Sequence, residues 1–163
     1  MKKIIFVRHA KSSWAYNVGD TERPLKKRGI VDAGLVSEEF KSNDITPEVV
    51  FSSPAKRAFE TCSIFVRNFN FLEENVRIED ALYDFGGQNV VQFIKLLPND
   101  YKTVMIFGHN HALTSIVNTY GTTYIDNLPT SGLVVIEFDI GHWSDLKQGE
   151  TVRAIFPRDL KDK

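Results

Sequence analysis

An apolar run that stops abruptly at two basic side chains is the feature that most constrains the fold of this chain. Residues 4–7, Ile-Ile-Phe-Val, are β-branched or aromatic and have the length of a strand buried in a parallel sheet. Arg8 and His9 follow immediately. Because the interior of such a strand cannot hold these two side chains, we expect both just past its carboxyl end, where open α/β sheets bind their ligands.

Strand-like and helix-like segments alternate along the rest of the 163 residues. Strands are predicted at 49–51, 76–79, 103–107, 133–138 and 151–156, and helices at about 29–41, 54–69, 89–97 and 112–120. This order predicts an α/β fold, a doubly wound, mostly parallel sheet with helices on both faces and an antiparallel edge hairpin made by the last two strands. An α+β fold is the alternative. We also expect a single domain over 1–163, a turn at 43–47 and a loose charged tail at 157–163.

Composition limits the partners and the compartment. The formal net charge is −1, so neither nucleic acid nor an anionic membrane surface is expected as a partner. Arg8 ends the N-terminal apolar run too early for a signal peptide, and no stretch is long enough to span a bilayer. The single cysteine, Cys62, cannot form an intrachain disulfide. Together these features predict a cytoplasmic protein.

Basic side chains follow three of the predicted strands. Arg8 and His9 follow the first, Arg57 lies in the first turn of the helix after the second, and His109 follows 103–107 after a single glycine. Because the carboxyl ends of parallel strands line one edge of a sheet, we expect these four side chains to converge. Guanidinium groups match phosphate oxygens bidentately, and a neutral imidazole can attack phosphorus. The pattern therefore predicts a phosphoryl-transfer site that needs no metal ion or other cofactor.

Three stretches in this order resemble the signature of the histidine phosphatase superfamily: residues 7–10, 52–61 and 107–110. Further stretches are similar to its compact branch, the SixA-like phosphohistidine phosphatases: residues 8–14, 23–29, 126–132 and 156–158. The resemblance implies that His9 is the nucleophile. It also implies that the phosphoryl group is bound by Arg8, Arg57 and His109. His109 would in addition stabilise the charge of that group.

The resemblance leaves the acid that protonates the leaving group open. Larger members of the family carry a glutamate before a glycine, and Asp84 stands at the comparable place, which implies an acid role for Asp84. The phytase-like branch has an acid directly after the distal histidine, where this chain has Asn110. Ala15 and Lys11 depart from the mutase pattern. The short connections after the second and third strands leave no separate lid, so a phosphate carried on a protein surface could enter.

The sequence therefore predicts a metal-independent phosphatase that works through a phosphohistidine intermediate, with protein phosphohistidine as the favoured substrate. A phosphomonoesterase acting on a small phosphorylated metabolite and an inactive phosphate- or phosphohistidine-binding module are the alternatives. His109 and His111 could instead be a metal pair. The basic cluster 26–28 is either a solvent-exposed segment at the start of a helix or a docking site for an acidic partner. The oligomeric state does not follow from the sequence.

Overall fold

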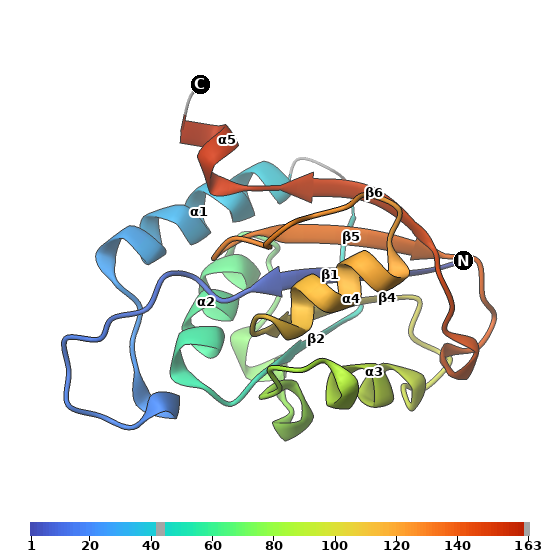
Figure 1. Ribbon diagram of the computed structural model, residues 1–163, viewed down its shortest axis with the longest axis horizontal. Coiled ribbons are helices and arrows are strands. Elements are labelled where there is room, and N and C mark those ends of the chain that lie inside the picture. Colours follow the sequence, from blue (N-terminus) through green and yellow to red (C-terminus); the bar gives the residue numbers. More distant parts are fainter. Residues whose placement is uncertain (42–44, 162–163) are drawn as a thin grey trace.

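The computed structural model describes residues 1–41 and 45–161, and it contains a six-stranded mixed sheet in the order β3-β2-β4-β1-β5-β6 (Figure 1). The first four strands in the chain run parallel to one another, whereas β5 is antiparallel to β1 and β6 is antiparallel to β5. The predicted parallel sheet with an antiparallel edge hairpin is confirmed. The strands are β1 (Lys2–Arg8), β2 (Val49–Ser52), β3 (Arg77–Ile78), β4 (Thr103–Gly108), β5 (Leu133–Phe138) and β6 (Glu150–Ile155).

Helices cover both faces of this sheet, and in Figure 1 α4 passes in front of β1 while α2 lies behind it. Side chains of α1 and α2 pack on one face, and side chains of α3 and α4 pack on the other. The remaining helix, α5, packs against α1. The helices are α1 (Lys27–Lys41), α2 (Lys56–Arg67), α3 (Gln88–Lys95), α4 (Ala112–Tyr120) and α5 (Pro157–Lys161).

The central strand β1 explains why helices cover both faces of the sheet. Successive side chains of a strand point to opposite faces, so Ile4 and Phe6 join one core while Ile5 and Val7 join the other. All four are fully buried. A strand that is apolar at every position can be buried only between two layers of helices, as the sequence predicted.

The structure corrects the prediction for the C-terminal tail. Residues 157–163 were predicted to be loose, but Pro157–Lys161 forms α5. Pro157 fits the first helical position, Leu160 packs against the core on the α1 side, and Lys161 Nζ lies 2.8 Å from a carboxylate oxygen of the buried Asp32. Residues 162–163 lie outside the described residues, as do residues 43 and 44 of the turn predicted at 43–47.

Within residues 1–41 and 45–161, the helices are too short or too polar for any of them to cross a lipid bilayer.

Candidate active site

The structure brings the four predicted residues together at the carboxyl edge of the sheet. β1 and β4 are adjacent and parallel, with Arg8 opposite Gly108, so His9 and His109 leave the sheet side by side. Their ring centroids are 5.2 Å apart. Arg57, in the first turn of α2, places Nη2 3.5 Å from His109 Nδ1. Arg8 is held by a 2.8 Å bond from its Nη1 to the carbonyl of Leu128, and its charge acts on both imidazoles.

The contacts of His9 leave one ring nitrogen free. Nδ1 lies 2.7 Å from the carbonyl oxygen of Ala10, and a carbonyl can only accept, so this nitrogen carries the hydrogen. Nε2 therefore keeps its lone pair. The backbone around the ring is also fixed, because the His9 amide donates to the Gly108 carbonyl and the Ala10 amide donates to Thr61 Oγ1.

Burial and nearby cations keep His9 neutral. The side chain is almost fully buried, and burial lowers the pKa of His9 to about 3, with further lowering by the charges of Arg57, Arg8 and Arg23 and an opposing effect of the Ala10 carbonyl. A neutral imidazole with a free Nε2 is the form that can attack phosphorus.

His109 has the opposite tautomer. Arg57 can only donate, so His109 Nδ1 accepts and Nε2 carries the hydrogen, which it donates to Ser53 Oγ at 2.8 Å. Ser53 Oγ also accepts a bond from the Ala55 amide, at the entrance to α2. Burial lowers the pKa of His109 to about 3, and the neighbouring His9 ring, which cannot share a second positive charge, and the charge of Arg57 lower it further, while Asp20 opposes them. The ring is held on both sides, and it is neutral before substrate binds.

A carboxylate that the sequence analysis missed organises the arginines. The Asp20 side chain accepts bonds from Arg57 Nη2 at 3.0 Å, from Arg23 Nε at 3.2 Å and from the Tyr83 hydroxyl at 2.5 Å. The Asp20 carbonyl accepts a fourth bond, from Arg57 Nη1 at 2.7 Å. The Tyr83 hydrogen bond and the two arginines lower the pKa of Asp20 to about 2. This carboxylate is therefore ionised, and Asp20 fixes both terminal nitrogens of Arg57, Nη2 through the carboxylate and Nη1 through the main-chain carbonyl.

Arg23 is a third arginine of the site that was not singled out from the sequence. It is 7% exposed, donates to Ser12 Oγ at 2.7 Å, and lies 3.6 Å from the centroid of the exposed Trp14 ring. A buried arginine with two fixed partners is positioned as firmly as a core residue. The available signal was indirect: Asp20 and Arg23 both lie in the long polar loop between β1 and α1, and long ordered loops are commonly functional.

Asp84 makes a different set of contacts. Its carboxylate accepts bonds of 3.0–3.1 Å from four backbone amides at the start of α3: Gly86, Gly87, Asn89 and Val90. This is the arrangement of a helix cap, which satisfies amides that have no partner within the helix. The acid role of Asp84 stays a prediction, and these contacts assign the carboxylate to the stability of α3.

Asn110, which follows His109, also makes contacts that stabilise the fold. Asn110 Oδ1 accepts bonds from the amide and the hydroxyl of Thr114, in the first turn of α4, and its amide nitrogen donates to Asn127. Among the described residues, no three His, Cys, Asp or Glu side chains are grouped so that they could hold a metal ion.

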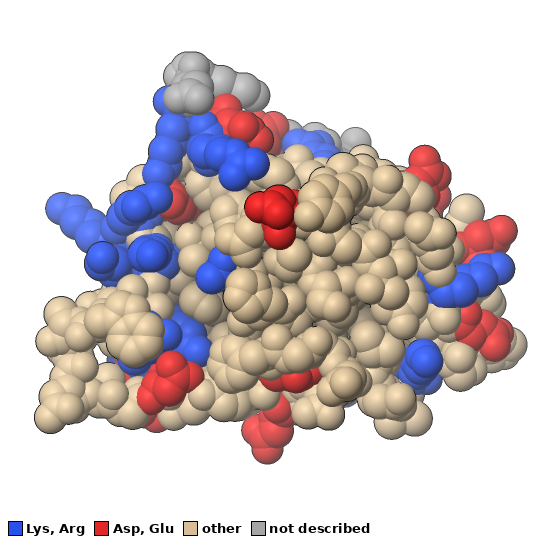
Figure 2. All heavy atoms as spheres, viewed as in Figure 1, with Lys and Arg blue, Asp and Glu red and all other residues tan. Residues whose placement is uncertain are grey.

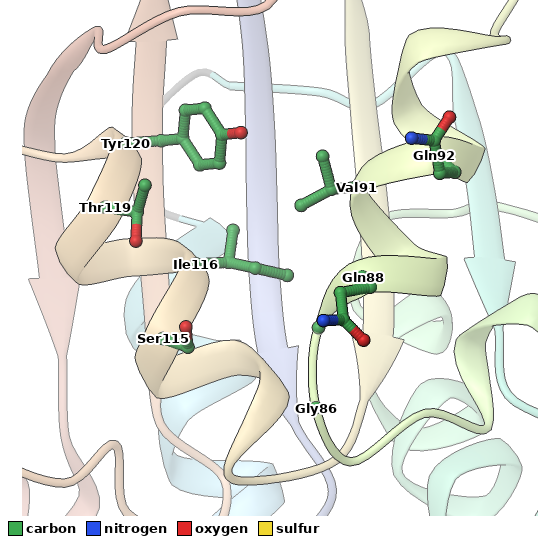
Figure 3. Close-up of a pocket in the computed structure, with 9 residues that line it drawn as sticks. Gly86, Gln88, Val91, Gln92, Ser115, Ile116, Thr119 and Tyr120 are labelled. Carbon is green, nitrogen blue, oxygen red and sulfur yellow. The ribbon is translucent and has the colours of Figure 1, made fainter.

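A pocket of about 350 Å³ lies between α3 and α4, and it is separate from the histidines (Figure 3). Val91 and Ile116 face each other across it, and Gln88 and Ser115 stand at its rim. No charged side chain lines it. It therefore lacks the cations that a phosphoryl group requires.

Comparison with known proteins agrees with this geometry. The family model described as the histidine phosphatase superfamily (branch 1) matches residues 4–90, just over half of the chain. The uncharacterised protein Rv1276c of Mycobacterium tuberculosis is 29% identical over 153 residues, covering 88% of this chain and 93% of that protein. Phosphoserine phosphatase 1 of Hydrogenobacter thermophilus is 29% identical over 107 residues, covering 63% of this chain and 50% of that protein.

The same fold is found in the protein histidine phosphatase SixA complexed with tungstate. The TM-score is 0.81 at 19% identity, with 97% of this chain and 99% of that chain covered. The chain thus belongs to the histidine phosphatase superfamily, branch 1, and it is a phosphatase of the class that works through a histidine intermediate.

Proposed function

We propose that this protein removes the phosphoryl group from phosphohistidine on other proteins, with His9 as the nucleophile. One observation carries the proposal: His9 is neutral, its Nδ1 is tied to a carbonyl, and its free Nε2 lies among the charges of three arginines. A nucleophile needs the free lone pair, and a phosphoryl dianion needs the cations.

The reaction would proceed in two displacements. His9 Nε2 attacks phosphorus, and the new N–P bond forms as the bond to the substrate nitrogen breaks. The departing imidazole takes a proton from solvent. Water then attacks the phosphoryl group, the N–P electrons return to Nε2, and inorganic phosphate leaves. The charge that spreads over the three equatorial oxygens would be met by the side chains Arg8, Arg57 and His109.

His109 and Asp20 would support this chemistry from opposite sides. A bound dianion favours the charged form of a nearby imidazole, so His109 would gain a proton as substrate binds and donate to a phosphoryl oxygen. Asp20 holds Arg57 through two bonds and Arg23 through one, so it would act as the positioning residue for both guanidinium groups. Fixed donors lower a barrier more than mobile ones, because they need no reorganisation during the reaction.

Access to the site favours a substrate carried on a protein. Only residues 53–55 connect β2 to α2, and only residues 109–111 connect β4 to α4. Beside the site, the Trp14 ring on the β1–α1 loop is 76% exposed, and Phe85, whose ring centroid is 5.1 Å from that of His109, is 47% exposed. Short connections and exposed aromatic side chains beside the nucleophile suit a macromolecular substrate. SixA, which has the same fold, is a protein histidine phosphatase, and this supports the same reaction class for the present chain.

The test compares two peptides of one sequence, one carrying phosphohistidine and the other phosphoserine at the same position. We expect kcat/KM to be at least about tenfold higher for the phosphohistidine peptide, because imidazole leaves more easily than an alkoxide. Rapid quenching should trap an enzyme-bound phosphate that is labile in acid and stable in base, as an N–P bond is. An equal or higher value for phosphoserine would overturn the substrate assignment.

A small phosphomonoester is the second candidate, and the relationship to phosphoserine phosphatase 1 favours it. Free phosphoserine belongs in the same panel. If free phosphoserine is the better substrate while the trapped intermediate is unchanged, the nucleophile assignment stands and the metabolite is the substrate. An inactive binding module does not fit a free nucleophilic nitrogen in a family of phosphatases.

A further inference from the structure

Exposed cations gather on one side of the catalytic edge. Figure 2 shows Lys and Arg side chains clustered over the start of α1 and over α5, whereas blue and red spheres alternate on the opposite side of the view. We call this cluster the basic rim. Its members are all exposed: Lys11, Lys26, Lys27, Arg28, Arg158 and Lys161.

The basic rim is joined directly to the nucleophile. Lys11 is two residues beyond His9 in the chain, and the Lys26 amide donates to the Lys11 carbonyl at 2.9 Å. On the other side, the Ser131 amide lies 3.2 Å from the His9 carbonyl. A group held by the rim would therefore lie next to the reacting phosphoryl group.

A hollow of about 390 Å³ lies within the basic rim. Three of the rim cations, Arg28, Arg158 and Lys161, line it together with Asp32, Pro129, Thr130 and Pro157. Thr130 immediately precedes Ser131, so the hollow borders the segment that contacts the backbone of His9. A hollow of this size accommodates one or two side chains of a partner.

The charges of the rim are mostly unbalanced. Asp32 is the one carboxylate that lines the hollow among the described residues; it is 3% exposed and pairs with Lys161 at 2.8 Å and with Arg28 at 3.8 Å. The exposed Asp159 lies on α5 as well. The other four members of the rim form no ion pair with any carboxylate in residues 1–41 and 45–161. An anionic partner would therefore meet free positive charge.

We propose that the basic rim docks an acidic segment that flanks the phosphohistidine of the substrate protein, with a carboxylate side chain seated in the hollow. This inference rests on the proposed function and names the partner's chemistry. The whole chain carries a net charge of −1, so the positive field is local to the catalytic edge and does not attract polyanions generally. Rim charges act mainly on the rate of encounter, which makes their effect strong at low salt and weak at high salt.

The first experiment uses three synthetic peptides with the same central phosphohistidine and with Glu, Ser or Lys residues on both sides. At low salt we expect kcat/KM for the acidic peptide to exceed that for the neutral peptide by about tenfold, within the range of electrostatic steering, and the Lys peptide to be slowest. At about 0.5 M NaCl, where charges are screened within a few ångströms, the three values should converge. Free phosphohistidine measures the chemistry without docking and should show little dependence on salt.

The second experiment reverses charge in the rim with a triple variant, Lys11→Glu, Lys27→Glu and Arg158→Glu. The readout is the ratio of kcat/KM for the acidic peptide to that for the neutral peptide, which cancels any general loss of activity. We expect the ratio to fall to one or below. The matched control is Lys95→Glu, Lys102→Glu and Lys147→Glu, located away from the catalytic edge, and it should keep the wild-type ratio. Thermal unfolding of both variants checks that each is folded.

The outcomes separate docking from chemistry. Equal values for the acidic and neutral peptides at low salt, or the same loss of preference in the control variant, would overturn the docking proposal while the phosphohistidine phosphatase assignment stands. Failure to hydrolyse phosphohistidine in any form, with aryl phosphate still cleaved, would overturn the proposed function and the docking inference with it.

Discussion

At the scale of single residues, the hydrogen bond from His9 Nδ1 to the Ala10 carbonyl determines which atom can react. His9→Ala removes that atom, and we expect kcat on an aryl phosphate to fall by at least about 10³-fold, as for removal of other covalent nucleophiles. Steady-state kinetics measure the change. His142→Ala is the control, since that side chain is 65% exposed in a surface turn. Wild-type turnover by the His9 variant would exclude His9 as the nucleophile.

Asp20 offers a test that separates positioning from binding. Asp20→Asn keeps a hydrogen-bond acceptor but removes the charge that holds Arg57 and Arg23. We expect kcat to fall about tenfold because the donors are less fixed, and KM to stay the same or decrease because a negative charge near the dianion is gone. Glu22→Gln, in the same short helical turn, is the matched control. A rise in KM with kcat unchanged would contradict a positioning role.

At the scale of elements, the contacts of Asp84 with four amides predict that it stabilises α3. Asp84→Ala should lower the free energy of unfolding by about 1 kcal/mol, as for loss of a helix cap, and should change kcat less than about tenfold. Urea unfolding and steady-state kinetics on the same variant test both parts. If kcat falls more than about a hundredfold, the usual effect of losing a general acid, while stability is unchanged, Asp84 is the leaving-group acid after all.

The elements that the sequence predicted well are those with one dominant local signal. β1 and β4 are almost uninterrupted apolar runs, and α2 has a regular apolar face, so each was found with its basic residue in place, although α2 begins at Lys56 and not at residue 54. The network that Asp20 and Arg23 form with Arg57 and Tyr83 could not be predicted, because it joins one loop to two distant segments and depends on how the loop folds back. α5 was missed because its stability comes from packing on α1 and from the Lys161 pair with Asp32.

At the scale of the whole molecule, two buried neutral histidines connect the site to global stability. His9 and His109 both have a pKa of about 3 in the folded chain, against 6.5 for an ordinary histidine. Between about pH 6.5 and 3 the unfolded chain therefore binds more protons than the folded chain, so the free energy of unfolding decreases as the pH falls below about 6.5. Asp20, whose pKa is lowered to about 2, also decreases the free energy of unfolding as the pH falls, but only below about pH 4.

The window from about pH 6.5 to 4.5 thus isolates the histidines, and each should contribute a slope of up to about 1.4 kcal/mol per pH unit. Urea unfolding at intervals across this window measures the slope. The double variant His9→Asn and His109→Asn removes both titrating rings and should flatten the curve, whereas His142→Ala should leave it steep. Saturating phosphate should also raise the stability of the wild type, because the dianion binds the folded chain alone. A wild-type curve as flat as that of the double variant would mean that the two rings bind protons as readily in the folded chain as in the unfolded chain. Burial would then not keep His9 neutral below about pH 6.5, and the account of its free lone pair in this pH range would be wrong.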